Sequence, residues 1–170
     1  NLYVEHNGVV SISPSGFHRK TENSGIRFQV PQGFGYSKAA LQLGNARFDT
    51  GEGSHVCYDL YTFHSGWATV YVYVLPLFAK DKSHSTRYGI QIDDLDYITQ
   101  SNDVKEYSTD WANNVIRNSA IDTVKVFLNK PGKHTLKLFC EDPGMIIQKM
   151  VIDMGGLKDS YLGPVSSKVE

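Results

Sequence analysis

The sequence predicts an all-β sandwich, and three observations support this fold class. Residues that favour strands (Val, Ile, Thr, Tyr, Phe and Trp) make up 54 of the 170, whereas Ala, Leu and Glu contribute only 25. Short apolar runs are separated by turn residues every 8 to 15 positions, which is typical of a sandwich or barrel. Because the length corresponds to about one domain, we expect a single β-sandwich module over residues 1–170, with an irregular tail over 155–170.

The expected strands follow the apolar runs in order, and the first three lie at 9–13, 26–30 and 39–43. The clearest run is WATVYVYVL at 67–75, which is β-branched or aromatic almost throughout and so predicts that both faces are covered. It follows a strand at 56–63 through the tight turn 64–66, which ends in glycine. Further strands are expected at 87–92, 124–128, 134–139 and 146–153.

One segment departs from the strand pattern. Residues 108–116 begin with capping residues and an acidic first turn, and Trp111 and Val115 are i, i+4 neighbours, so we expect one short helix. A twisted strand is the alternative.

The order of the strands predicts where the loops lie. Consecutive antiparallel strands place their connections at alternate ends of a sheet. The long connections 14–25, 44–55, 76–86, 100–120 and 141–145 should therefore gather on one rim, and long loops on a rigid scaffold are where binding residues concentrate.

Charge and hydropathy exclude several classes of partner. Seventeen basic residues against eighteen acidic ones leave a net charge of −1, which gives no electrostatic surface for nucleic acid or an anionic membrane. No apolar run reaches the roughly 18 residues that a membrane-spanning helix needs. We therefore expect no nucleic acid and no membrane as partners. The chain begins at Asn1 rather than Met, which indicates a processed or excised piece.

The sequence carries no motif for catalysis or cofactor binding. The segment GFG at 33–35 opens like a dinucleotide loop, but Lys38 stands where the third glycine is needed. The six histidines lack zinc spacing, and there is no G-x-S-x-G segment. Cys57 and Cys140 lie within or at the end of apolar strands, so we expect two buried free thiols and no disulfide between them.

Two groups of carboxylates lie next to turn residues. Asp93, Asp94 and Asp96 form one group, and Glu141 with Asp142 precedes a Pro-Gly pair. Both groups fit turn structure, and the alternatives are a calcium site or an acid–base pair.

Five aromatic side chains lie in or next to predicted loops: Tyr36, Tyr88, Tyr97, Tyr107 and Trp111. A sugar ring needs a flat stacking face with a few oriented hydrogen-bonding groups beside it. The alternative is that these rings fill the ends of the sandwich.

Several stretches are similar to those of a known family. Residues 141–153 read EDPGMIIQKMVID and 155–164 read GGLKDSYLGP, while PGKHTLK stands at 131–137. Trp111, Val115 and Asn118 form a W-x-x-x-V-x-x-N pattern that the same family has. Residues 72–76 and 90–94 are also similar to stretches of this family. From about residue 8 to 164, the chain resembles the C-terminal β-sandwich module of glycoside hydrolase family 115, the α-glucuronidases.

The resemblance implies a galactose-binding-domain-like jelly roll, similar to carbohydrate-binding modules of families 6 and 35. It implies a non-catalytic accessory module of a secreted polysaccharide-degrading glycoside hydrolase, with an extracellular or periplasmic location. The implied partners are a plant-type polysaccharide or oligosaccharide and the catalytic domains of the parent enzyme. Related modules hold a structural calcium with glutamates of a V-S-I-E-A-E opening, whereas Ser13 and Ser15 stand at those positions here. We expect no cofactor, with a structural calcium as the alternative.

The long-loop rim is the expected binding site. Its connections 44–55 and 100–120 offer rings for stacking and amide, guanidinium and carboxylate groups for sugar hydroxyls. The candidate carbohydrate-binding residues are Asn45, Arg47, Asp49, Asn102, Tyr107 and Trp111. The alternative is a structural or dimerisation module that packs on the catalytic domains without binding sugar itself. Exposed aromatics at an open groove would favour sugar binding, whereas a flat apolar patch would favour docking.

Overall fold

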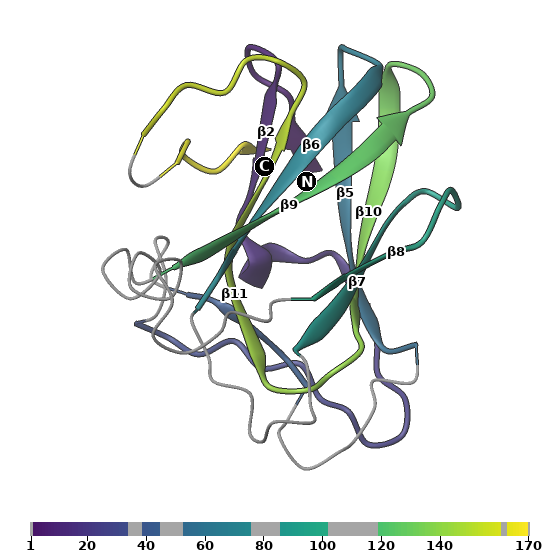
Figure 1. The fold of residues 1–170 in the computed structure, drawn as a ribbon, viewed down its shortest axis with the longest axis vertical. Coiled ribbons are helices and arrows are strands. Elements are labelled where there is room, and N and C mark those ends of the chain that lie inside the picture. Colours follow the sequence, from purple (N-terminus) through teal and green to yellow (C-terminus); the bar gives the residue numbers. More distant parts are fainter. Residues whose placement is uncertain are drawn as a thin grey trace.

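The structure is a computed structural model that describes residues 2–33, 39–44, 53–75, 86–101, 119–160 and 163–169. These residues form two β-sheets packed face to face (Figure 1). The predicted all-β sandwich is confirmed. In the described part of the chain the only helix is a single 3₁₀ turn, η1 (Pro14–Gly16). The helix expected at 108–116 lies outside the described residues.

The first sheet has seven strands in the order β12-β1-β5-β10-β7-β8, with β3 beside β5. β1 runs parallel to β5, and the other pairs are antiparallel. β1 and β3 pair with different parts of β5. The strands are β1 (Leu2–Val4), β3 (Arg19–Thr21), β5 (His55–Thr62), β7 (Arg87–Ile92), β8 (Ile98–Ser101), β10 (Gly132–Cys140) and β12 (Lys168–Val169).

The second sheet has five strands in the order β2-β11-β6-β9, with β4 beside β11. All its pairs are antiparallel, and β6 pairs with β9 along its whole length. The strands are β2 (Val9–Ile12), β4 (Leu41–Leu43), β6 (Gly66–Val74), β9 (Ala120–Leu128) and β11 (Met145–Asp153).

The strand expected at 26–30 is wrong. Ile26 and Phe28 are buried, as the apolar pattern indicates, but their backbone groups bond to a turn and not to a ladder. The Ile26 N–H donates to the carbonyl of Asn23, and the Phe28 N–H donates to the carboxylate of Glu22. A single bridge between Gln29 and Gln42 is the sheet pairing of this segment.

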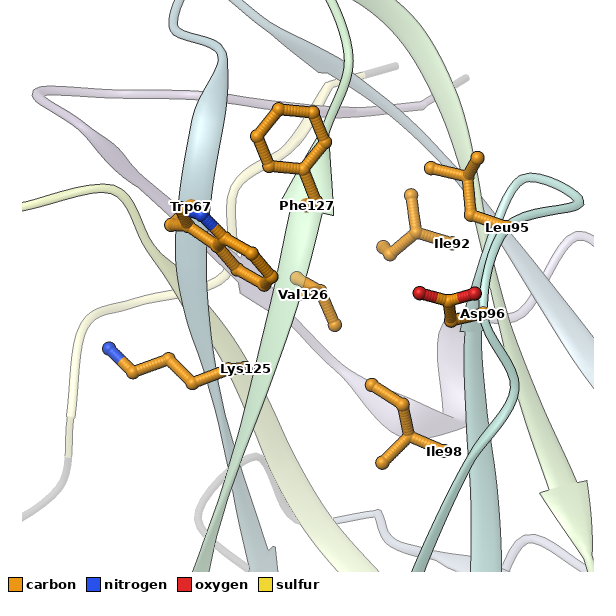
Figure 2. A pocket seen from close by; sticks show the side chains of 8 residues that line it. All are labelled: Trp67, Ile92, Leu95, Asp96, Ile98, Lys125, Val126 and Phe127. Atoms are coloured by element: carbon orange, nitrogen blue, oxygen red, sulfur yellow. The ribbon is translucent and has the colours of Figure 1, made fainter.

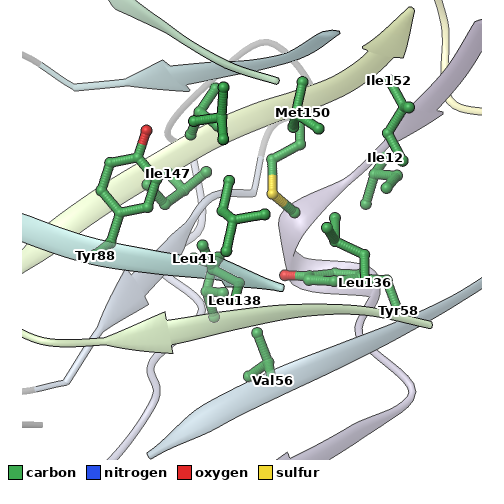
Figure 3. Close-up of a cluster of buried hydrophobic side chains, with 14 of the residues drawn as sticks. Ile12, Leu41, Val56, Tyr58, Tyr88, Leu136, Leu138, Ile147, Met150 and Ile152 are labelled. Carbon is green, nitrogen blue, oxygen red and sulfur yellow. The ribbon is translucent and has the colours of Figure 1, made fainter. Parts of the chain in front are cut away.

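The core fills the space between the two sheets with side chains that alternate along each strand (Figure 3). Tyr58 on β5 is opposite Leu136 on β10, and both point inward against Met150 of the other sheet. Two buried tyrosines bind polar groups inside the core. The Tyr58 hydroxyl donates to the carbonyl of Pro14 at 2.7 Å, and the Tyr88 hydroxyl donates to Asp122 on the facing sheet at 2.9 Å.

The two cysteines lie on opposite faces of the seven-stranded sheet. Cys57 is opposite Lys137 in the β5–β10 register and shares its outward face, whereas Cys140 faces inward with Leu136 and Leu138. Both thiols are free and buried. A disulfide needs Cα atoms within about 7 Å and Cβ atoms that face each other. The expectation of two unbonded buried thiols is confirmed.

The C-terminal tail contacts both sheets. Leu157 packs with Val9, Tyr73 and Val151 in a small hydrophobic cluster on the outer face of the five-stranded sheet. The carbonyl of Pro164 accepts hydrogen bonds from the Lys149 ammonium at 2.8 Å and from the Ser11 hydroxyl at 2.9 Å. The chain then pairs with β1 as β12. The tail therefore joins the edges of the two sheets. Tyr161 and Leu162 lie outside the described residues.

Candidate functional site

The strand register brings the long connections to one end of the sandwich. Arg87 at the start of β7 pairs with Ser101 at the end of β8, and Phe139 near the end of β10 pairs with His55 at the start of β5. In the other sheet, the ends of β6 and β4 lie beside the starts of β9 and β11. The strand ends that adjoin 44–54, 75–86, 102–119 and 141–144 therefore share one rim, as the strand order predicts. The fifth expected connection, 14–25, differs from the prediction, because it contains η1 and the strand β3, which pairs alongside β5.

The six candidate residues of this rim stay a prediction. Asn45, Arg47 and Asp49 fall in the segment 45–52, and Asn102, Tyr107 and Trp111 fall in 102–118. Both segments lie outside the described residues. Their flanking residues are described, so the structure gives the position of the two segments' ends on the rim.

The carboxylates of the two turn groups stabilise local structure. Asp93 has a positive φ of 53°, and its carboxylate accepts hydrogen bonds from the Thr135 N–H and the buried His134 ring, each at 2.8 Å. The Asp142 carboxylate accepts two hydrogen bonds from Arg87, one from the backbone N–H at 2.8 Å and one from the guanidinium Nε at 2.9 Å. These contacts agree with the interpretation of both groups as turn structure.

Of the aromatic candidates, Tyr88 and Tyr97 lie in the described residues. Tyr88 is fully buried in the core, so it fills the sandwich as the alternative interpretation stated. The Tyr97 ring lies across Gly89, where an added Cβ would overlap it, and its edge meets Phe139. Its hydroxyl donates to Glu141 at 2.7 Å. Burial and this hydrogen bond to a carboxylate raise the pKa of Tyr97.

The opposite end of the sandwich carries a groove that the sequence reasoning missed. It has a volume of about 120 Å³ and lies between β9 and the turn that joins β7 to β8 (Figure 2). Val126 and Ile92 lie in it, and Trp67 and Phe127 stand on its β6–β9 side. The complete lining is Trp67, Ile92, Leu95, Asp96, Ile98, Lys125, Val126 and Phe127.

The expectation that both faces of 67–75 are covered is wrong at one end of the strand. Tyr73, which the tail contacts, is only 6% exposed, whereas Trp67 on the same outer face is 72% exposed. In the sequence, Phe127 alternates with the inward Val126 and Leu128, which indicates that Phe127 lies on the outer face, but no sequence pattern shows that the outer face at Trp67 is left uncovered.

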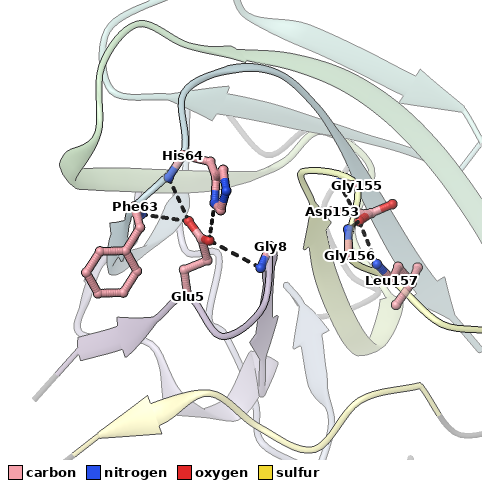
Figure 4. A network of polar contacts seen from close by, with 8 residues as sticks. All are labelled: Glu5, Gly8, Phe63, His64, Asp153, Gly155, Gly156 and Leu157. Carbon is pink, nitrogen blue, oxygen red and sulfur yellow. Dashed lines mark hydrogen bonds and ion pairs between the residues drawn. The ribbon is translucent and has the colours of Figure 1, made fainter.

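A buried carboxylate near this end organises the β5–β6 turn (Figure 4). Glu5 Oε2 accepts the backbone N–H groups of Phe63 and His64 at 2.6 and 3.0 Å. Its Oε1 accepts the Gly8 N–H at 3.2 Å and the Nδ1 of His64. Burial acts to raise the pKa of Glu5, but the hydrogen bonds from His64 and Phe63 outweigh it and hold the pKa below the usual value.

Ser13 and Ser15, which stand where the family resemblance places calcium-binding glutamates, do not fit a calcium ion. The hydroxyls of Ser13 and Ser15 lie 3.4 Å apart, and the Ser13 carbonyl accepts a hydrogen bond from Tyr3. Calcium in proteins is held by six to eight oxygens, with carboxylates among them. Within the described residues, no group of three His, Cys, Asp or Glu side chains is arranged to hold a metal ion.

The described ranges also hold no helix that is long and apolar enough to span a bilayer.

Comparison with known families gives one match. The model of the glycosyl hydrolase family 115 C-terminal domain matches residues 2–166, which is nearly the whole chain. None of the curated proteins that were compared matches the sequence.

Solved structures share the fold. A 4-O-methyl-α-glucuronidase of family 115, BtGH115A, described as having specificity for decorated arabinogalactans, superposes with a TM-score of 0.71 at 18% identity over 87% of this chain. The matched region is 18% of that chain, so the sequence spans less than a fifth of its length. The C-terminal family 6 carbohydrate-binding module of LamC, a laminarinase from Zobellia galactanivorans, gives 0.56 at 12% identity, with 85% and 98% of the two chains covered. The family 35 module of Abf62 from Cellvibrio japonicus gives 0.55 at 14% identity, with 85% and 91% covered.

Proposed function

The chain belongs to the glycosyl hydrolase family 115 C-terminal domain family, and from this premise we propose that it is a non-catalytic carbohydrate-binding module of a secreted polysaccharide-degrading enzyme. The module comprises residues 1–170, tail included. Its ligand is a plant-type polysaccharide or oligosaccharide, and its protein partners are the catalytic domains of the parent enzyme. The enzyme acts outside the cytoplasm, in the extracellular space or the periplasm, where such polymers are found.

The observation that carries the proposal is the rim where the long connections meet. The strand register brings the ends of 45–52 and 102–118 to the same end of the sandwich. These segments contain Tyr107 and Trp111 for stacking, and Asn45, Arg47, Asp49 and Asn102 for hydrogen bonds to hydroxyls. Similarity of the fold to carbohydrate-binding modules of families 6 and 35 supports this assignment.

The rim should bind glycan weakly. A shallow site that buries few groups typically gives about −4 kcal/mol, which corresponds to a Kd near 1 mM. Such affinity suits an accessory module, because many copies of the ligand are presented along one polymer and the parent enzyme stays close to its substrate.

Affinity electrophoresis in gels that contain xylan, pectin or arabinogalactan tests the proposal. We expect one of these polymers to retard the wild-type module, and Tyr107→Ala to remove most of the retardation with an unchanged melting temperature. If wild-type protein is not retained by any glycan at millimolar concentration, the proposal fails. The structural module that packs on the catalytic domains then takes its place.

A further inference from the structure

We propose that the groove lined by Trp67, Phe127, Asp96 and Lys125 is a second binding site, which takes one neutral sugar ring. It lies at the end of the sandwich away from the long-loop rim. The inference rests on the proposed function in that the sugar belongs to the same polymer that the rim binds.

The exposure of Trp67 is the first observation. The C-terminal tail covers part of the outer face of the five-stranded sheet, so that Tyr73 and Val151 are buried there. At the other end of β6, Trp67 is 72% exposed, and its neighbour Phe127 on β9 is 45% exposed. Burying a large aromatic side chain stabilises a fold. Because these two rings are exposed, they contribute little of this free energy to stability. Large exposed apolar groups that gather in one place mark binding surfaces.

The geometry of the two rings is fixed before any ligand arrives. Trp67 and Phe127 are direct cross-strand partners in the β6–β9 register, with ring centroids 5.3 Å apart and planes at 65°. This edge-to-face contact holds the indole against β9 (Figure 2). Because both residues lie on paired strands rather than on loops, little ordering is needed on binding, which favours affinity.

Polar groups at the groove suit hydroxyls. The Lys125 ammonium donates one hydrogen bond, to the Thr69 hydroxyl at 2.7 Å, and an ammonium has three donors. Across the groove, the Asp96 carboxylate makes no hydrogen bond or ion pair with another described residue. Figure 2 shows the Lys125 ammonium on the β6 side of β9, beside Trp67, and the Asp96 carboxylate on the other side of β9, so each flank of the aromatic pair offers one polar group to a hydroxyl. Since their charges are opposite, the described lining has no net charge, and this favours a neutral sugar over a uronic acid.

The size of the groove restricts the occupant. A volume of about 120 Å³ is well below the roughly 300–1,000 Å³ of pockets that enclose a drug-sized ligand, so only one ring of a polymer can enter. A protein partner would need an interface of about 1,000 Å² in total. Here polar side chains, Thr69, Lys125 and Asp96, border the two rings.

Two measurements test the second site, both on the module with its full sequence. In affinity gels that contain whichever of xylan or arabinogalactan retards the wild type, we expect Trp67→Ala to weaken retention about fivefold to tenfold, the scale of one aromatic contact. The matched control is Phe63→Ala, because Phe63 is 60% exposed, lies in the turn just before β6 and packs on Tyr61. The control should retain wild-type affinity, and both variants should have the melting temperature of the wild type.

The second measurement separates the groove from the rim. In Tyr107→Ala protein, millimolar neutral oligosaccharide should still protect tryptophan fluorescence from acrylamide, and adding Trp67→Phe should remove the protection. If neither measurement responds to the change at Trp67 while the wild type is retained through Tyr107, the second site is refuted and the proposed function stands. If the oligosaccharide still protects Trp67 but no polymer retards the wild type, the proposal of glycan binding at the rim is refuted and the proposal of a sugar site in the groove is supported. Equal loss in Phe63→Ala and Trp67→Ala would also refute the groove.

Discussion

Replacing Glu5 by glutamine should destabilise the module, because this carboxylate is only 4% exposed and receives four hydrogen bonds. Each oxygen accepts two of them: Oε2 from the Phe63 and His64 N–H groups, and Oε1 from the Gly8 N–H and the His64 ring. A glutamine has one amide oxygen, so its NH₂ group would face two donors. Glutamine also removes the charge that strengthens all four bonds.

The size of the effect follows from those bonds. A hydrogen bond to a charged group contributes about 1.5–3 kcal/mol, and part of the network can rearrange, so we expect a loss of about 3 kcal/mol. For a domain of this length, 1 kcal/mol shifts the melting temperature by about 2–4 °C, which predicts a fall of about 6–12 °C at neutral pH. Thermal unfolding followed by circular dichroism measures this shift. Asp94→Asn is a suitable control, since Asp94 is exposed and forms a surface ion pair with Lys137.

The pH dependence has a definite sign. The pKa of Glu5 is lower in the folded protein than its ordinary value of 4.5. The unfolded chain therefore takes up the proton first as the pH falls. The stabilisation from Glu5 is complete above pH 4.5 and is lost as the pH falls through the folded pKa. The difference between wild type and Glu5→Gln should narrow below pH 4.5, and equal melting at pH 7, or a constant difference down to pH 3, would refute the reasoning.

Three further predictions concern the tail and the thiols. Gly156→Ala should lower the melting temperature by several degrees, because its Cβ would overlap the carbonyl of Asn7 and overpacking costs about 1–3 kcal/mol; unchanged melting would contradict the close approach of these two segments. Deleting the chain from Gly156 onward should remove about 1–2 kcal/mol, also seen as a shift of several degrees, and a truncated protein that melts like the wild type would show that the tail does not stabilise the sandwich. Thiol titration in denaturant should count two free sulfhydryls, whereas native protein should react slowly because burial raises the pKa of Cys140 to about 12 and also raises that of Cys57; a count near zero in denaturant would reject the claim.

The sequence predicts most of the long strands, but it places the start of β9 at 124 rather than at Ala120, and it misses four of the short strands. Strands β5, β6, β10 and β11 lie within a residue or two of their expected ranges, because their alternating or continuous apolar patterns are set by the core. Strands β1, β3, β8 and β12 have no counterpart among the expected ranges. Each has two to four residues, and their pairing comes from the strands beside them rather than from a pattern of their own.

The two candidate sites also differ in how far the sequence predicts them. The position of the rim follows from the order of the strands along the chain, which the apolar runs indicate, and the register agrees with it. The exposure of Trp67 depends on where the tail lies, which is a tertiary property that an apolar run cannot reveal. Glu5 likewise has no signal in the sequence, since its donors at 63 and 64 come from a turn nearly sixty residues away.

The motifs that identify the family act on the scaffold. Asp153, at the end of the EDPGMIIQKMVID stretch, accepts the N–H groups of Gly155, Gly156 and Leu157, each at 2.9 Å, and so starts the tail (Figure 4). Lys149 of the same stretch donates to Pro164 at the tail's far end, and burial lowers the pKa of this lysine. The two stretches are thus one structural unit that holds the tail on the sandwich.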